Sequence, residues 1–382
     1  MSESPPPRRR IVSIDALRGF VMLLMMVDHV RETFFMHAQV SDPMPLDTET
    51  WLFVSRLLAH LCAPIFIVLT GISAWLYGAK NGGARAASGF LFKRGLFLVV
   101  LEVTVISLAW SFDPTPDRYF LQVIWAIGVS MIALSVLLHL PCPVLAAIGL
   151  VIVFGHNLLD PISVQPGQWA YIPWTILHDR GLIDLPWGAD IRTSYPLLPW
   201  IGVIALGYAA GPWFGAQTAE PVRTRALLAT GAGALVLFAV IRTINGYGEP
   251  VPWQVGETWV RTVLSFLNVT KYPPSLDVLL VTLGLGALLL VALERAPAVL
   301  SNLLAVFGGA PLFFYILHLF VLGIANRLCL AIWGPNQGDY FSVANMGWVW
   351  LVALLCAALL WAPCRAFIAL KSRRPHPILS YL

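Results

Sequence analysis

Residues 13–35 read SIDALRGFVMLLMMVDHVRETFF, and this stretch decides the class of protein. A helix needs about 20 mostly apolar residues to cross a bilayer. The stretch is too long for the apolar part of a signal peptide, and no convincing small-residue cleavage site follows it. Its charged or titratable side chains include Asp15, Arg18, Asp28 and His29. We therefore expect a retained membrane-spanning helix.

The composition of the whole chain agrees with a membrane protein. Of its 382 residues, 58% are apolar and 12% are charged, whereas about a quarter of the residues in soluble domains are charged. This composition excludes an ordinary soluble protein, a disordered chain and a nucleic-acid-binding module. The five cysteines are too few for a disulfide framework, and most lie in or beside apolar runs, which indicates buried small side chains.

Ten stretches are long and apolar enough, or nearly so, to span a membrane. By residue number they are 13–35, 51–78, 90–111, 119–139, 142–159, 196–214, 225–243, 276–294, 303–329 and 346–370. A further amphipathic stretch, 255–269, is expected to lie along the membrane surface. The predicted fold class is therefore all-α, a polytopic transmembrane helical bundle of about ten spans that forms a single domain over residues 1–382.

Basic residues are concentrated in the loops on one side of this bundle. They are Arg8, Arg9, Arg10, Lys80, Arg85, Lys93, Arg94, Arg223, Arg225, Arg295 and residues 371–374. Because positively charged loops stay in the cytoplasm, we expect both termini there, with residues 1–12 as a cytoplasmic tail. Residues 160–195 and 244–275 are then the two long outer loops.

Ionisable side chains inside a spanning helix are costly unless they face a partner, water or the bundle interior. At about 100° per residue, the first span places five residues on one stripe: Asp15, Arg18, Met22, Met25 and His29. We expect this stripe to face an internal cavity that runs most of the way across the bilayer. The alternative for Asp15 and Arg18 is an ion pair that anchors the helix end.

Two further histidines are expected at the depth of His29. Arg56 and His60 lie on one face of the second span, and Pro64 leaves the carbonyl group of residue 60 without its helical donor. With His318 in the ninth span, three histidines converge in the outer half of the membrane, and His29 is the candidate general base. The alternatives are packing histidines and a metal site; we expect no metal, because short ligand spacings are absent.

The run SIDALRG, residues 13–19, resembles the start of the catalytic domain of heparan-α-glucosaminide N-acetyltransferase and its bacterial relatives, which are multi-helix membrane acyltransferases. Arg18, ten intervening residues and His29 match the Arg-x10-His motif of the related acyltransferase-3 branch. Four further blocks are similar to recurring blocks of the family: APIFI with Thr70-Gly71 (63–71), YPLLPW (195–200), TKYPPSL (270–276) and GAPLFFYILH (309–318). The resemblance thus covers essentially the whole chain.

The resemblance implies transfer of an acetyl or similar acyl group from cytoplasmic acyl-CoA to an acceptor beyond the membrane. The acceptor is an amino sugar or an envelope glycan, and acetyl-CoA is the co-substrate. The implied location is the bacterial cytoplasmic (inner) membrane, so the partners are membrane lipid, acyl-CoA and a sugar or glycan. No nucleic-acid partner is expected, and the sequence does not decide between a monomer and a homodimer.

The resemblance carries Arg18 and His29 over as motif residues. The animal enzymes have asparagine at the position of His29 and a catalytic histidine further on, in a Phe-x-His-Ala setting. Residues 35–38 resemble that setting at a spacing three residues shorter, which makes His37 a second candidate base. Residue chemistry favours His29, because it lies on the polar stripe within the bilayer.

Two sets of site residues follow. The candidate catalytic residues are His29, His60, Asp28, His37 and His318. An oxyanion would be stabilised by His60, His318 or Arg56. The candidate acyl-CoA-binding residues are Asp15, Arg18, Arg56, Lys93 and Arg94. The competing hypotheses are a small-molecule transporter or flippase, whose paired interrupted helices the sequence does not show, and a membrane protein without chemistry.

Overall fold

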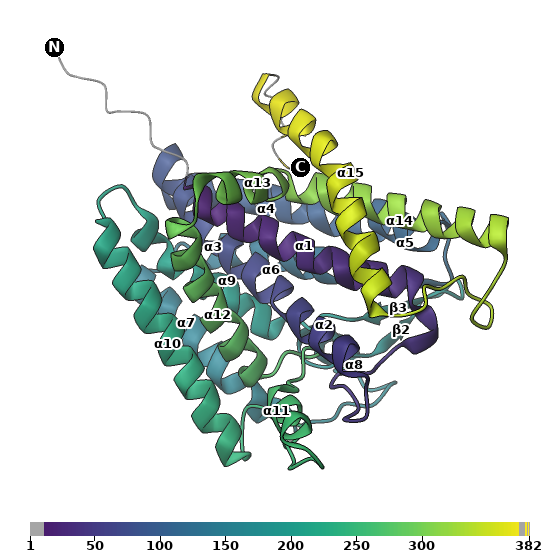
Figure 1. Ribbon diagram of the computed structural model, residues 1–382. Coiled ribbons are helices and arrows are strands. Elements are labelled where there is room, and N and C mark those ends of the chain that lie inside the picture. The colour runs from purple at the N-terminus through teal and green to yellow at the C-terminus, as the bar shows by residue number, and fades with distance from the viewer. Residues whose placement is uncertain (1–10, 374–378, 380, 382) are drawn as a thin grey trace.

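The computed structural model describes residues 11–373, 379 and 381. Most of these residues are helical. The helices are α1 (Val12–Phe34), η1 (Met36–Ala38), α2 (Thr50–His60), α3 (Cys62–Asn81), α4 (Ala84–Leu101), η2 (Glu102–Ile106), α5 (Ser107–Ser111), α6 (Val123–Leu137), α7 (Cys142–Gly155), η3 (His156–Leu159), α8 (Tyr171–Leu177), α9 (Leu198–Ala210), η4 (Gly211–Phe214), α10 (Glu220–Ile244), α11 (Trp259–Leu267), α12 (Leu276–Arg295), α13 (Ala298–Gly309), α14 (Pro311–Trp333) and α15 (Met346–Arg373) (Figure 1). Most of the predicted tail 1–12, with its three arginines, and Arg374 lie outside the described residues.

Six helical segments are long and apolar enough to cross a membrane, counted over the described part of the chain. They are Thr50–Asn81, Cys142–Leu159, Glu220–Ile244, Leu276–Arg295, Pro311–Trp333 and Met346–Arg373. Three shorter apolar helices accompany them. The protein is therefore a helical membrane protein. The count of about ten spans and the cytoplasmic placement of the termini stay predictions.

Two predicted spans are broken at defined positions. The predicted kink before Pro64 lies at Leu61, between the end of α2 and the start of α3. The predicted ninth span, 303–329, is two helices, because α13 ends at Gly309 and α14 begins at Pro311. A proline in the first turn removes an N–H group that has no helical acceptor anyway, so Pro311 begins a new helix and places His318 about two turns into it.

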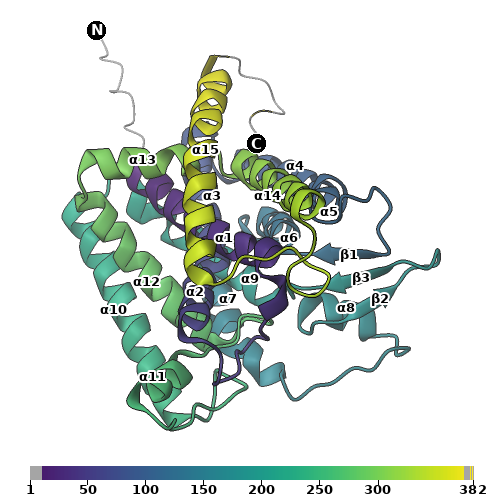
Figure 2. The same ribbon diagram turned by 45° about the vertical axis from the view of Figure 1, so that its right-hand side comes forward.

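A small sheet departs from the all-α expectation. Its strands are β1 (Arg118–Leu121), β2 (Leu182–Asp184) and β3 (Asp190–Thr193), in the order β1-β3-β2. β1 runs parallel to β3, and β2 runs antiparallel to it. Figure 2 shows the sheet beside α8 at the edge of the molecule. The predicted fourth span, 119–139, therefore begins as a strand, and its helix starts at Val123.

The most extensive helix contacts are α1 with α13, α3 with α9, α4 with α6, α7 with α9, and α10 with α12. Each pair meets at a glycine from each helix: Gly19 and Gly308, Gly71 and Gly207, Gly95 and Gly128, Gly149 and Gly202, and Gly231 and Gly284. A Cβ atom on Gly19 would collide with the carbonyl oxygen of Leu304, and one on Gly308 with that of Asp15. Small residues thus let these backbones touch, as in other membrane bundles.

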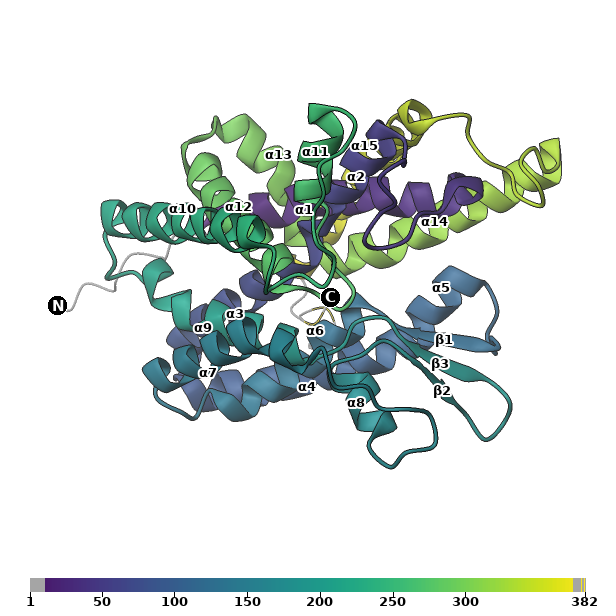
Figure 3. The same cartoon turned by 90° about the horizontal axis from the view of Figure 1, so that it is seen from below.

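The helices form two groups. Seen from below, α4, α6, α7 and α9 lie on one side, and α10, α12, α13 and α14 lie on the other (Figure 3). Helix α1 packs on α3 and α13, and α15 packs across α1 (Figure 1). The cavity described below lies where these groups meet.

A buried histidine fastens the first long outer loop to the end of α7. His178 is 3% exposed. Its Nε2 atom lies 3.1 Å from the carbonyl oxygen of His156 and 3.3 Å from Oδ1 of Asp160, and its Nδ1 atom lies 3.0 Å from Oδ1 of Asp179. All three partners are acceptors, so both ring nitrogens donate and the ring is protonated. Although burial opposes the charge, the hydrogen bonds to Asp160 and Asp179 raise the pKa of His178 to about 9.

This pKa predicts a pH-dependent stability. The folded value of about 9 exceeds the unfolded value of about 6.5, so the stabilisation is complete below pH 6.5 and is lost as the pH rises through 9. We expect a loss of about 1–2 kcal/mol, because solvent screens the partly exposed carboxylates. Thermal unfolding in detergent at pH 6 and pH 9.5 measures it. His178→Gln should show a smaller difference, and an equal difference in both proteins would contradict the assignment.

Candidate functional site

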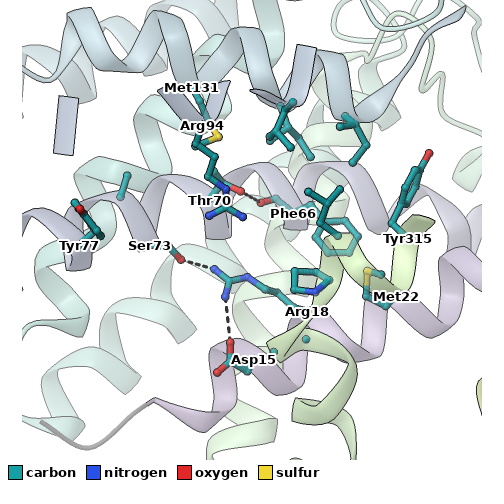
Figure 4. Close-up of a pocket in the computed structure, with 18 of the residues that line it drawn as sticks. Asp15, Arg18, Met22, Phe66, Thr70, Ser73, Tyr77, Arg94, Met131 and Tyr315 are labelled. Carbon is teal, nitrogen blue, oxygen red and sulfur yellow. Dashed lines mark hydrogen bonds and ion pairs between the residues drawn. The ribbon is translucent and has the colours of Figure 1, made fainter. Parts of the chain in front are cut away.

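A cavity of about 530 Å³ lies beside α1. On α1 it is lined by four of the five residues of the predicted stripe, namely Asp15, Arg18, Met22 and Met25 (Figure 4). The other walls come from α3, α4, α6, the junction of α13 and α14, and the last turns of α15. The stripe thus faces the bundle interior, as its helical periodicity predicts.

One part of the cavity wall is basic. Arg18, Arg94 and Lys371 line it from three different helices. Arg18 donates hydrogen bonds to Oδ1 of Asp15 at 3.1 Å, to the Leu69 carbonyl oxygen at 3.2 Å and to the Ser73 hydroxyl (Figure 4). The ion pair offered as the alternative for Asp15 and Arg18 is therefore present, and it forms part of the cavity wall.

Two of the expected acyl-CoA-binding residues lie away from the cavity lining. Lys93 is exposed, and Arg56 is buried within α2. Arg56 donates from Nη1 to both carboxylate oxygens of Asp28, at 2.9 and 3.1 Å, and Arg31 donates to Asp28 at 3.0 Å. Asp28 and Arg56 therefore join α1 to α2 through a buried ion pair.

The opposite part of the cavity wall is apolar and ends beside His29. Met22, Phe66 and Ile124 line it, and Tyr315 closes it. Figure 4 shows Tyr315 at the side remote from Ser73 and Tyr77. The Tyr315 ring packs edge-on against the His29 ring, with 5.7 Å between centroids. Tyr315 precedes His318 by three residues, so a helical reading of the GAPLFFYILH block could have found it.

His29 and His318 form a hydrogen-bonded pair at this end. The Nδ1 atom of His29 lies 2.6 Å from the Nε2 atom of His318. The Nδ1 atom of His318 lies 2.8 Å from the Phe314 carbonyl oxygen, which can only accept. His318 Nδ1 therefore carries the proton and its Nε2 accepts from His29, so the lone pair of His29 lies on Nε2. The network thus selects the tautomer that a general base needs.

The other two candidate histidines lie elsewhere. His60 is buried, and its Nε2 atom lies 3.8 Å from Oδ1 of Asp42. His37, in η1, is exposed. The structure thus brings His29 and His318 together, places His60 beside the carboxylate of Asp42, and leaves His37 at the surface.

The comparisons with known proteins agree with this architecture. The sequence model described as heparan-alpha-glucosaminide N-acetyltransferase, catalytic, matches residues 10–241, which is more than half of the chain. Comparison with curated proteins gives no match. The matched range contains His29 and the cavity residues of α1, α3, α4 and α6, whereas His318 follows it. The chain therefore belongs to the family of heparan-α-glucosaminide N-acetyltransferase catalytic domains.

Proposed function

We propose that the protein transfers an acyl group, normally acetyl, from cytoplasmic acyl-CoA to a sugar or glycan on the far side of a bacterial inner membrane. The observation that carries this proposal is the cavity that leads from Arg18 and Arg94 to Tyr315, beside the His29–His318 pair. Its volume of about 530 Å³ falls in the usual range for small-molecule sites.

In this proposal the donor lies along the cavity. Arg18 and Arg94 bind the phosphates, since guanidinium groups recognise phosphate oxygens in a bidentate way. The pantetheine arm follows the apolar wall past Met22 and Phe66, and the thioester carbon reaches the neighbourhood of Tyr315. The N-terminal end of α1 then faces the cytoplasm.

The chemistry follows from the tautomer of the histidine pair. His29 Nε2 accepts the proton from the acceptor hydroxyl or amine as its oxygen or nitrogen attacks the thioester carbonyl. The C–S bond breaks, and coenzyme A leaves after its sulfur takes up the proton. His318 Nε2 accepts from His29 Nδ1 throughout, which stabilises the imidazolium that His29 becomes.

The direct test supplies radiolabelled acetyl-CoA to the purified protein together with amino sugars and neutral sugars. Label is expected in at least one acceptor. Label that appears in none, while the protein is folded and acetyl-CoA is bound, would overturn the proposal. Uptake of a sugar into vesicles without acyl-CoA would favour a transporter instead.

Replacing a basic cavity residue should weaken donor binding. We expect Arg94→Ala to raise the KM for acetyl-CoA roughly tenfold, because a charge-assisted hydrogen bond is worth about 1.5–3 kcal/mol. Lys93→Ala is the matched control, because Lys93 is the neighbouring residue but is exposed. Initial rates against acetyl-CoA concentration measure the effect. An equal rise in both variants would indicate general surface electrostatics rather than a phosphate site.

A further inference from the structure

A second group of polar side chains lies on the outer-loop side of His29. We define the outer cluster as Asp42, His60, Arg180, Lys271 and Tyr272. These residues come from three loops and the end of α2, and none of them is among the residues that line the cavity. Arg180 is exposed and Lys271 is 3% exposed, so the cluster extends from the surface inward.

Lys271 is a buried cation with few partners. Its Nζ atom donates to the Ala59 carbonyl oxygen at 3.3 Å and lies 5.0 Å from the centre of the Tyr272 ring. It forms no ion pair with a carboxylate of the described residues within 4.0 Å. Burying an ammonium group costs several kcal/mol unless a partner compensates it, so a negatively charged ligand would be stabilised here.

The charges around Lys271 leave an excess of positive charge. Arg31 and Arg56 are neutralised, because their ion pairs go to Asp28 and Glu32. Arg180 lies 5.3 Å from the Tyr272 ring centre, on the same ring as Lys271. Burial and then the charge of Arg192 lower the pKa of Arg180.

One carboxylate faces these cations within the described cluster. Asp42 accepts a hydrogen bond from the Lys271 backbone N–H at 3.0 Å, but its Oδ1 atom is buried without a partner in the described structure. Burial raises the pKa of Asp42. Both ring nitrogens of His60 likewise have no hydrogen-bond partner there. Since nearly all buried polar groups are hydrogen-bonded, these atoms are open to a ligand that carries both donors and acceptors.

The outer cluster is adjacent to the histidine pair. Arg56, which is bonded to Asp28, precedes His60 by one helical turn, and Asp28 is the chain neighbour of His29. The Nζ atom of Lys271 donates to the carbonyl oxygen of Ala59, the chain neighbour of His60. Tyr272 donates to or accepts from the Tyr195 hydroxyl at 2.9 Å. A ligand held by the cluster would therefore lie near the histidine pair and outside the residues that line the donor cavity.

We propose that the outer cluster binds the acceptor, and that the acceptor carries an anionic group, a phosphate or a carboxylate, that pairs with Lys271 and Arg180. This inference rests on the proposed acyl transfer and specifies its acceptor class. The hydroxyl and amine groups of the sugar bond to His60 and to Asp42 Oδ1. The reacting group then lies beside His29 Nε2.

The test measures binding of three amino sugars to the purified protein by calorimetry without acyl-CoA. Glucosamine is the probe without an anionic group, glucosamine 6-phosphate carries a phosphate and muramic acid carries a carboxylate. We expect at least one anionic sugar to bind roughly 10- to 100-fold more tightly than glucosamine, the range of a charge-assisted pair. Equal affinity for all three, or binding of none, would overturn the proposal. The sugar that binds best identifies the anionic group.

Lys271→Met should abolish the preference for the anionic sugar. Arg180→Met is the second variant if Lys271→Met does not fold, because Arg180 is exposed. Arg118→Met is the control: it removes an exposed outer cation that is paired with Asp190 at 2.6 Å and lies outside the cluster, and its affinities should not change. A preference that persists in both cluster variants would overturn the assignment.

The two proposals fail in distinguishable ways. Anionic sugars that bind through Lys271 without becoming acetylated would support the outer cluster and contradict the acyltransferase. Acetylation of neutral and anionic sugars with equal kcat/KM would support the acyltransferase and contradict the anionic acceptor.

Discussion

His29→Gln is expected to lower the rate of acyl transfer by about 10²- to 10⁴-fold, the usual contribution of a general base. Glutamine can still donate a hydrogen bond to His318 Nε2, but its amide cannot accept the acceptor's proton. The folded structure and acetyl-CoA binding should persist, because neither depends on the basicity of residue 29. Initial rates with labelled acetyl-CoA measure the loss.

His37→Gln is the matched control for this experiment, and it also decides between the two candidate bases. His37 is exposed in η1, whereas His29 is 8% exposed and bonded to His318 at 2.6 Å. We therefore expect His37→Gln to keep most of the activity. A large loss in His37→Gln together with an active His29→Gln would transfer the catalytic role to His37.

Gly308→Ala is expected to destabilise the protein by about 1–3 kcal/mol or more, the usual range for overpacking. The added Cβ atom would collide with the backbone carbonyl of Asp15. A backbone carbonyl inside a helix cannot rotate away as a side chain can, so α13 must move away from α1. The melting temperature in detergent and the yield of monodisperse protein measure the effect.

Gly233→Ala is the control for the helix crossing. Gly233 lies in α10, and a Cβ atom there has no neighbour within 4 Å. Alanine is the better helix former, so the melting temperature should stay constant or rise slightly. Equal destabilisation by both substitutions would show that loss of glycine, rather than the α1–α13 contact, causes the effect.

The sequence predicts which side of α1 faces the cavity, because that follows from helical periodicity alone. Asp15, Arg18 and Met22 recur at the spacing of one helix face, and the structure places them together on the cavity. The sequence also predicts that the charged side chains of α1 have partners inside the protein. This follows from the local sequence, because a charged side chain within a span is energetically costly without such a partner. The resemblance identifies the family, and the family match confirms it.

The pairing of His29 with His318 could not be derived in this way. The two residues are 289 positions apart, and their contact depends on how α1 and α14 are rotated about their own axes. Depth along the bilayer can be estimated from residue counts, but rotation depends on packing. For this reason His60, expected at a similar depth, lies next to Asp42. Lys271 stands in one of the family-like blocks, but it lies in a loop, where helical periodicity does not indicate which way a side chain points.

Hydropathy could not predict the helix break between Gly309 and Pro311 either. Residues 303–329 are mostly apolar, so their hydropathy alone does not separate two helices. The separation depends on Gly308, which holds α13 against α1, and on Pro311, which begins α14. Both residues were visible in the sequence, but only the crossing with α1 gives them this role.

The contacts between helices at glycine residues also determine which part of the cavity wall can adjust. Helices α1, α3, α4 and α6 are each fastened to a neighbour by touching backbones. Helix α15 also borders the cavity, through Ile368 and Lys371, but its one glycine, Gly347, lies in its first turn, at the other end of the helix. Among the described residues, α15 has no glycine at which its backbone touches a neighbour beside the cavity. This part of the wall therefore depends on side-chain packing, whereas the walls formed by α1, α3, α4 and α6 are held by backbone contact.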